Sequence, residues 1–357
     1  MEVLLVHGAD QDSRNGQGNS PLILAASDKR TDSVELLLRY GARVKVVNNK
    51  GEAAIFHAAG RDMIDLLDRY GVDLNSFSNE GLTPLINHAW KRRLHSLEAL
   101  LDHGVPVDQI RPSNQVLATE GETALFLCRS AQCVKLLIDR GAHIHHRDAA
   151  GRTALAHHVQ GQRASPLKAL LDSGASIDAT DRRGRTALFT ASEEQYVEFL
   201  IRRGACVNHQ DEDGWTALME FSSWGRADCV ATAVKLGASV NHISWRDGNT
   251  ALCVAQTSEV IDVLLSHGAD IEQRNKQGCT PLLIATSRGD WQTMSAFRER
   301  GSKVDVVSYH GENALQLAKR NEHEYTAKIL ERDCPELRQS LGPYEIVHSY
   351  RMTFGCL

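Results

Sequence analysis

The stretch "GRTALFTASEEQYVEFLIRRGACVN", Gly184–Asn208, contains the two signals that decide the fold. It opens with a Gly-x-Thr-Ala-Leu motif, and it closes with an apolar helix that ends in Gly-Ala. The opening recurs, degraded to "GEAAI" at one site, with its glycine at Gly18, Gly51, Gly81, Gly121, Gly151, Gly184, Gly214, Gly248, Gly278 and Gly311. Successive openings are 33, 30, 40, 30, 33, 30, 34, 30 and 33 residues apart, which predicts about ten similar units.

The closing signal recurs in register with the opening, as in "VELLLRYGA", "CVKLLIDRGA", "LKALLDSGA" and "VIDVLLSHGA". A repeat near 33 residues with these two motifs resembles the ankyrin repeat. The resemblance implies an all-α fold, an ankyrin-type α-solenoid of helix-turn-helix units joined by β-hairpin loops. We expect a partial N-terminal repeat at 1–17, an array of about ten units alternating roughly 33 and 30 residues at 18–332, and a C-terminal cap or docking tail at 333–357.

The recurring residues have physical roles in such a unit. The threonine of each opening stands where the first helix begins, so its hydroxyl can cap free backbone N–H groups. This interpretation covers Thr83, Thr123, Thr153, Thr186, Thr216, Thr250 and Thr280. The glycine that follows the second helix suits a left-handed C-cap. One unit is too small to bury its own apolar face, so stability must come from stacking on neighbouring units.

The chain departs from the family pattern in two ways. Where the family places a histidine after the motif leucine, this sequence has Ile23, Phe56, Ile86, Phe126, Ala156, Phe189, Met219, Cys253, Leu283 and Gln316. We expect apolar packing to replace the hydrogen bonds of that histidine. The 30-residue units also lack three residues between their two helices. We expect this deletion to shorten the turn on the back side of the stack and to spare the hairpins.

Composition bounds the classes of function. The net charge of −5 argues against a basic surface for binding nucleic acid. No apolar segment approaches the roughly 18 residues of a membrane span. The N-terminus lacks the pattern of a secretory signal. Eight cysteines are spread thinly, several in apolar helices, which fits a reducing compartment. We therefore expect a soluble intracellular protein, cytoplasmic or nuclear.

The residues that could support catalysis or metal binding do not form a recognised motif. A cluster of histidines at 143–158 lies near Cys128 and Cys133 in the sequence, but the two cysteines lack the spacing of a zinc knuckle. Solvated hairpin positions explain these histidines better. The sequence shows no phosphate-binding loop and no nucleophile elbow. We expect no enzyme activity, no metal and no cofactor.

The resemblance implies that a protein partner binds on the concave face formed by the hairpins and first helices. Two zones are candidates: the long connection between Gly104 and Gly121, and the adjacent hairpins "NHQDEDGWT" and "NHISWRDGNT". A neutral loop insertion and indole packing between hairpins are the respective alternatives. Trp and Arg are frequent in interface hot spots. The candidate partner-binding residues are Arg111, Arg182, His209, Trp215, Trp245 and Arg246. Back-turn residues such as Lys29, Arg163 and Arg288 are expected to be nearly silent for binding.

Two hypotheses about function follow. The first is a monomeric, non-enzymatic scaffold or adaptor that binds a protein partner of unknown identity, with neither nucleic acid nor a membrane span involved. The second is the targeting portion of a larger enzyme, effector or ubiquitin-ligase adaptor whose other domain lies upstream. The short basic runs "WKRRLH" and "DRRGR" are interpreted as exposed helix and hairpin surface, with contact to an acidic partner peptide as the alternative.

Overall fold

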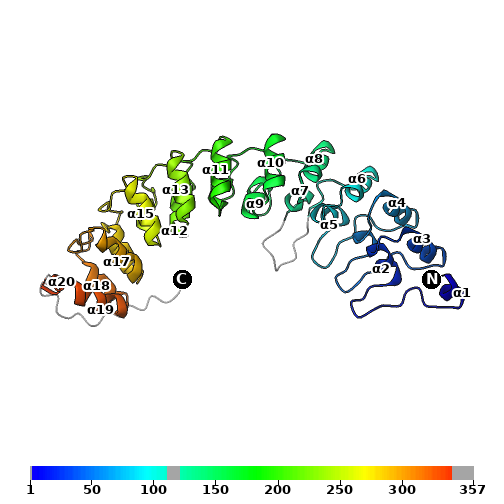
Figure 1. Ribbon diagram of the computed structural model, residues 1–357, viewed down its shortest axis with the longest axis horizontal. Coiled ribbons are helices and arrows are strands. Elements are labelled where there is room, and N and C mark those ends of the chain that lie inside the picture. The colour runs from blue at the N-terminus through cyan, green and yellow to red at the C-terminus, as the bar shows by residue number, and fades with distance from the viewer. Residues whose placement is uncertain (1, 111–120, 340–357) are drawn as a thin grey trace, which may run out of the picture. The chain divides into compact units, whose positions relative to one another are not determined.

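The computed structural model describes residues 2–110 and 121–339, and the described residues are helical apart from turns and two isolated bridges. They form two compact units: residues up to 191 with Arg202–Ala205 (unit 1), and Ser192–Ile201 with the residues from 206 on (unit 2). Each unit is a stack of helix pairs (Figure 1). The all-α prediction is confirmed. Among the described residues, no helix is long and apolar enough to cross a membrane.

Each repeat contributes one first helix and one second helix. The second helices are α3 (Thr31–Arg39), α4 (Arg61–Arg69), α6 (Leu94–Asp102), α8 (Ala131–Asp139), α10 (Ala164–Asp172), α11 (Glu194–Arg202), α13 (Ala227–Lys235), α15 (Ser258–Ser266), α17 (Trp291–Glu299) and α19 (Glu324–Asp333). Two short helices lie at the ends of the described chain, α1 (Glu2–Val6) and α20 (Glu336–Gln339).

The first helices come in two lengths, and the length follows the length of the repeat. The long ones have seven residues and are α2 (Pro21–Ser27), α5 (Pro84–Trp90), α9 (Ala154–Gln160), α12 (Ala217–Ser223), α16 (Pro281–Ser287) and α18 (Ala314–Arg320). The short ones have three or four residues and are η1 (Ala54–Phe56), α7 (Ala124–Leu127), η2 (Ala187–Thr190) and α14 (Ala251–Val254).

The three missing residues of the short repeats come out of the first helix. The connection to the second helix is three residues in long repeats, as between α2 and α3, and it is no shorter after α7, η2 or α14. The prediction that the back turn is shortened is therefore wrong. A shorter connection would leave too few residues for the chain to reverse direction between the two helices. Removing about one turn of the first helix keeps the connection intact and moves it along the helix axis.

Apolar side chains fill the space between successive repeats. Residues in the position of the family histidine are buried from Ile23 to Leu283, as expected. Gln316 has a different role, because it completes a capping box with Asn313 at the start of α18. First helices contact first helices of neighbouring repeats, as α5 contacts η1 and α7, and second helices contact second helices. Each apolar face is thus buried against a neighbour.

Threonine capping holds only where the first helix is long enough. The hydroxyls of Thr83, Thr153 and Thr280 accept from the N–H groups three residues later. The expectation is wrong for Thr123, Thr186 and Thr250, which begin short helices. There the same N–H group donates to the backbone carbonyl of the threonine in a 3₁₀-type bond, as from Phe126 to Thr123 at 3.1 Å. It is also wrong for Thr216, and nothing in the structure explains this case.

A short helix leaves carbonyl groups at its C-terminal end without intrahelical donors. The following long repeat supplies donors from two side chains. The carbonyls at the end of η1, in the second repeat, accept from two side chains of the third repeat. His88 Nε2–H donates to the Ile55 carbonyl at 2.9 Å, and Arg93 donates to the carbonyls of His57 and Ala58 at 2.8 and 3.1 Å.

The same arrangement closes two further short helices. His158 donates to the Leu125 carbonyl at 2.9 Å, and Arg163 donates to the Phe126 carbonyl at 3.3 Å. Arg288 donates to the Ala255 carbonyl, also at 3.3 Å. Arg163 and Arg288 are therefore ties between repeats. That they are nearly silent for partner binding stays a prediction.

We predict that Arg93→Met lowers the free energy of unfolding by about 1.5–3 kcal/mol, because two carbonyls at the end of η1 lose a charged donor. The matched control is Arg30→Met. Arg30 occupies the same position before its second helix, but its side chain is 68% exposed and no short helix precedes it. Its replacement should change stability by less than about 0.5 kcal/mol. Urea unfolding measures the stability of both variants. Equal losses would show that the hydrogen bonds of Arg93 to the end of η1 do not stabilise the fold.

A second prediction concerns pH. Burial lowers the pKa of His88 and of His158 to about 3, so both are neutral in the folded protein at pH 7. The unfolded chain, where histidine titrates near 6.5, takes up these protons first. Stability is therefore fully present above about pH 6.5 and falls toward pH 3, by up to about 1.4 kcal/mol per pH unit for each histidine.

The double variant His88→Gln with His158→Gln should flatten the loss of stability between pH 6.5 and pH 3, since a glutamine amide can donate to the same carbonyls without titrating in this range. The control is His95→Gln at an exposed position. Thermal unfolding at several pH values decides, and an unchanged pH profile in the double variant would refute the assignment.

Candidate partner-binding surface

Several of the described hairpins are organised by the side chain three residues before the turn glycine. Asp211 Oδ1 accepts from the N–H groups of Asp213 and Trp215 at 2.9 and 2.8 Å. Asp148, Asp181 and Asn275 make the same pair of bonds in their own hairpins. Asp and Asn favour such turns because their short side chains reach the backbone N–H groups that follow. The hairpin tips are therefore rigid supports for the side chains they present.

Neighbouring hairpins are joined through the residue two positions before the turn glycine. Its N–H group donates to the carbonyl of the residue before the preceding turn glycine, as Tyr309 donates to Gln277 at 3.0 Å. Its side chain then lies against that glycine. Asn49, Asn79, Arg182, Lys276 and Tyr309 occupy this position. Trp245 lies against Gly214 in the same manner, in a hairpin that is one residue longer.

Trp245 and Arg246 lie together on one hairpin of unit 2. The Trp245 side chain packs on Gly214 of the neighbouring hairpin, and 59% of it is exposed. Arg246 Nη1 lies 2.7 Å from Asp213 Oδ1, and both side chains are largely exposed. An exposed pair of this kind contributes at most about 1 kcal/mol to stability. Trp245 and Arg246 thus remain accessible to a partner.

Other predicted residues are placed differently. His209 and Trp215 are half-buried, and the Trp215 backbone is bonded to Asp211. Arg182 belongs to a hairpin of unit 1, where it is exposed and covers Gly151. Arg111 lies outside the described residues. The structure therefore gathers the predicted residues of 209–246 on neighbouring hairpins of unit 2, and Arg182 is a separate position in unit 1.

The sequence interpretation missed Lys276 and Tyr309, which continue the row begun by Trp245. The Tyr309 side chain is 70% exposed and lies against Gly278. Lys276 lies against Gly248, and its Nζ donates to the Trp245 carbonyl. Ile243 and Val307, on the hairpins of Trp245 and Tyr309, are also exposed. Aligning the residues two positions before the turn glycines would have found Lys276 and Tyr309.

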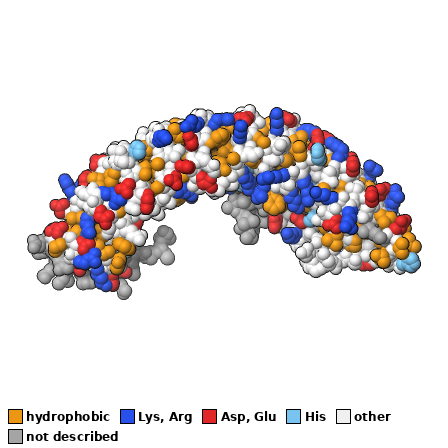
Figure 2. Space-filling model, in the orientation of Figure 1, with side chains coloured by type: hydrophobic (Ala, Val, Ile, Leu, Met, Phe, Trp, Pro, Cys, Tyr) orange, Lys and Arg blue, Asp and Glu red, His pale blue; other side chains and the backbone are white. Residues whose placement is uncertain are grey.

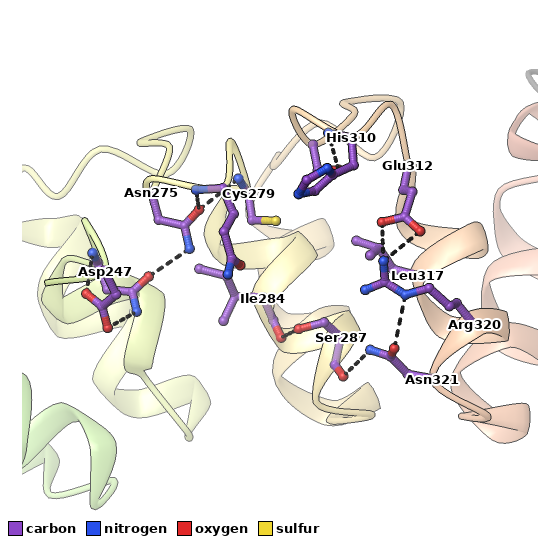
Figure 3. A pocket seen from close by; sticks show the side chains of 13 residues that line it. Asp247, Asn275, Cys279, Ile284, Ser287, His310, Glu312, Leu317, Arg320 and Asn321 are labelled. Atoms are coloured by element: carbon purple, nitrogen blue, oxygen red, sulfur yellow. Dashed lines mark hydrogen bonds and ion pairs between the residues drawn. The ribbon is translucent and has the colours of Figure 1, made fainter. Parts of the chain in front are cut away.

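A polar hollow of about 390 Å³ lies beside the row, between three hairpins and the first helices α16 and α18 (Figure 3). Its floor includes the apolar side chains of Ile284 and Leu317 and the buried thiol of Cys279. Its polar lining residues are Asp247, Asn249, Asn275, Gln277, Ser287, Ser308, His310, Glu312, Arg320 and Asn321.

The polar groups of the hollow are already ordered by one another. Glu312 accepts from Arg320 Nη1 with both oxygens, at 2.8 and 2.6 Å. Asn275 donates to Asn249 at 3.1 Å. Figure 3 shows His310 and Glu312 on one side of the hollow and Asn275 with Asp247 on the other. A mixed lining of this kind suits backbone and polar side chains of a bound peptide.

Reactive groups near the histidines of 143–158 are engaged in packing and hydrogen bonds. Cys128 is buried, burial raises the pKa of its thiol, and its Sγ lies 3.8 Å from His158 Nε2. His146 donates to the Gly121 carbonyl at 2.8 Å and so links two hairpins. Within residues 2–110 and 121–339, no three His, Cys, Asp or Glu side chains are placed to hold a metal ion. No disulfide joins the seven described cysteines.

The sequence and the structure were compared with known proteins. The family model described as ankyrin repeats (3 copies) matches residues 1–78, 129–211, 194–275 and 255–336, which is more than half of the chain. The chain belongs to the ankyrin-repeat family. Ankyrin repeats are typically non-catalytic domains for protein–protein interaction, and this supports an interaction domain here.

Similar curated proteins include ankyrin repeat and KH domain-containing protein mask-1 of Caenorhabditis elegans, 29% identical over 140 residues, which are 38% of this chain and 5% of that protein. Human ankyrin repeat and SOCS box protein 11 is 31% identical over 104 residues, covering 29% of this chain and 32% of that protein. The chain thus spans a third or less of their lengths.

One solved structure with the same fold is the crystal structure of the ankyrin repeat domain of Bcl-3, described as a unique member of the IkappaB protein family. The TM-score is 0.50 with 26% sequence identity, over 70% of this chain and 99% of that chain.

We predict that Gly214→Ala disturbs the Trp245 hairpin. Gly214 has φ +79°, and an added Cβ would lie 2.6 Å from the Trp245 backbone nitrogen, so the Trp245 hairpin would have to move. The control is Gly268→Ala, with φ +84° and open space around the new Cβ, which carries only the left-handed strain of about 1–2 kcal/mol. Gly214→Ala should cost clearly more in urea unfolding. Equal losses of stability in the two variants would show that the hairpins are not closely packed at Gly214.

Proposed function

We propose that the chain is a non-enzymatic scaffold or adaptor that binds an extended segment of a protein partner on the face of its hairpins and first helices. The observation that carries the proposal is the row of Trp245, Lys276 and Tyr309 beside the polar hollow of unit 2. Trp245 and Tyr309 are 59% and 70% exposed on hairpins that are already fixed by backbone bonds. A rigid support reduces the entropy lost when a partner binds.

The row and the hollow suit different parts of one ligand. Aromatic side chains supply large contact areas with few rotatable bonds, which is why Trp and Tyr are frequent in hot spots. The hollow offers amide, hydroxyl and carboxylate groups to the ligand backbone. Arg246, His209, Trp215 and, on unit 1, Arg182 are proposed as further contacts, as is Arg111 in the long connection after Gly104.

We further propose that the chain acts as a monomer in the cytoplasm or nucleus and does not bind nucleic acid. We also propose the division that the repeat pattern indicates: a partial repeat at 1–17, the repeat array at 18–332, and a cap or docking tail at 333–357. The second candidate function is the targeting portion of a larger enzyme, effector or ubiquitin-ligase adaptor. Its support is that two relatives carry, by their names, a KH domain or a SOCS box together with ankyrin repeats.

The test is affinity capture from lysate of the source organism with the full chain and the double variant Trp245→Ala with Tyr309→Ala. We expect proteins specifically captured by the unchanged chain to be depleted by roughly tenfold or more, since two hot-spot aromatics contribute more than about 1.4 kcal/mol together.

The control double variant is Trp291→Ala with Tyr325→Ala. These residues form an exposed edge-to-face pair, with ring centroids 5.5 Å apart, on the second helices α17 and α19 of the same unit. The control removes the same amount of aromatic surface from another face. If it depletes the captured proteins and the hairpin variant does not, the binding face is wrongly assigned.

A further inference from the structure

A group of cations lies at the turns that follow the first helices of unit 1. Lys91, Arg92 and Arg93 follow α5, Arg129 follows α7, and Arg163 follows α9. These five residues form what we call the turn-edge basic cluster. Figure 2 shows Lys and Arg side chains gathered over this part of unit 1. The cluster is separate from the hairpin row and the hollow, which belong to unit 2.

Several contacts bring the five residues together from three repeats. The Arg129 guanidinium lies over the ring of Trp90, 4.9 Å from its centroid, and Trp90 directly precedes Lys91. Arg163 donates to the Phe126 carbonyl, three residues before Arg129. Burial lowers the pKa of Arg163, and the charge of Arg129 lowers it further. Burial lowers the pKa of Lys91, the charge of Glu52 opposes this effect, and the charges of Arg93 and Lys50 add to it.

No acidic side chain among the described residues forms an ion pair with any member of the cluster. Two carboxylates lie nearby, and each is directed at a histidine: Glu52 lies 3.1 Å from His57, and Glu122 lies 3.2 Å from His157. Other arginines of this unit do form ion pairs, as Arg61 and Arg140 both bind Asp102. Glu52 acts electrostatically on Lys91 and Glu122 on Arg163, but the five cations outnumber these two carboxylates, so a chain with net charge −5 concentrates positive charge at one place.

The positions of the cations have a structural origin. Arg93 and Arg163 are held there because they donate to the ends of η1 and α7, and each retains further guanidinium N–H groups. Arg92 and Arg129 are exposed and make no such tie. Holding like charges together without a counterion is unfavourable, and an anionic ligand would relieve it. Arginine is also the side chain that best matches carboxylate geometry.

We propose that the turn-edge basic cluster is a docking surface for an acidic protein segment, rich in Asp and Glu. The half-exposed Trp90, 40% exposed, supplies apolar contact beside the charges. A single-stranded nucleic acid fits less well, because it needs free aromatic faces for its bases and Arg129 already covers a face of Trp90. The acidic net charge of the chain also opposes a long polyanion. The occupant is therefore a short acidic segment.

The test uses the full chain and a fluorescein-labelled peptide of twelve glutamates, with fluorescence anisotropy as the readout. We expect binding that weakens as salt rises, and a loss of affinity of roughly tenfold or more in the double variant Arg92→Glu with Arg129→Glu. Both residues are exposed, so the fold should persist, and a thermal unfolding curve checks this.

The matched control is Lys29→Glu with Arg30→Glu in the turn after α2 of the same unit. Lys29 and Arg92 occupy the same turn position and share a left-handed backbone, with φ +60° and +57°. The control changes the total charge equally, and its affinity should fall by less than roughly threefold. An equal fall in both variants would show a general charge effect and overturn the proposal.

Three other outcomes also overturn it. The first is no binding of the glutamate peptide at about 0.1 M salt, where charges within roughly 10 Å still interact. The second is tighter binding of a twelve-nucleotide single-stranded DNA that is lost in the same variant. The third is salt-sensitive self-association, seen by sedimentation, that Arg92→Glu with Arg129→Glu abolishes; the occupant would then be a second copy of this chain.

Discussion

The whole structure depends on the contact between one repeat and the next. A helix pair of this size cannot bury its apolar face, so the leucines of each first and second helix are buried only because a neighbour covers them. The hairpins also depend on their neighbours, here through hydrogen bonds. The N–H group two positions before the turn glycine, such as that of Tyr309, donates to a carbonyl of the preceding hairpin. Side chains presented on hairpin tips are therefore held by the stack and need no support from their own repeat.

The alternation of long and short first helices introduces one difficulty, which the chain solves with polar side chains. The short helices η1, α7 and α14 end with carbonyls that lack intrahelical donors. The following repeats supply donors from His88, Arg93, His158, Arg163 and Arg288. A buried carbonyl without a donor costs about 1–3 kcal/mol, so these ties matter as much as the apolar contacts around them. Arg93 and Arg163 in this way bring positive charge to the turns of unit 1, where no acidic side chain among the described residues forms an ion pair with either of them.

The two surfaces that result differ in chemistry. The hairpin row of unit 2 offers exposed aromatic side chains on a rigid support with a polar hollow beside them. The turn-edge basic cluster of unit 1 offers unpaired cations. Aromatic contacts contribute affinity with little salt dependence, whereas charged contacts act at longer range and weaken as salt rises. An adaptor with both kinds of surface can engage two ligands of different chemistry.

The sequence by itself determined the family, the pair of helices in each repeat and the buried face of those helices. It did so because two motifs recur in register and helical periodicity places the leucines on one side. It also named Trp245 and Arg246, on one hairpin, as candidate partner contacts, and the structure then showed that both are exposed. Tertiary structure alone decided that the three missing residues leave the first helix, since a deletion between two motifs does not show which side of the turn is shortened. It likewise decided which cations meet: Arg92, Arg129 and Arg163 come from three repeats, and stacking, which no local pattern encodes, places them at one edge.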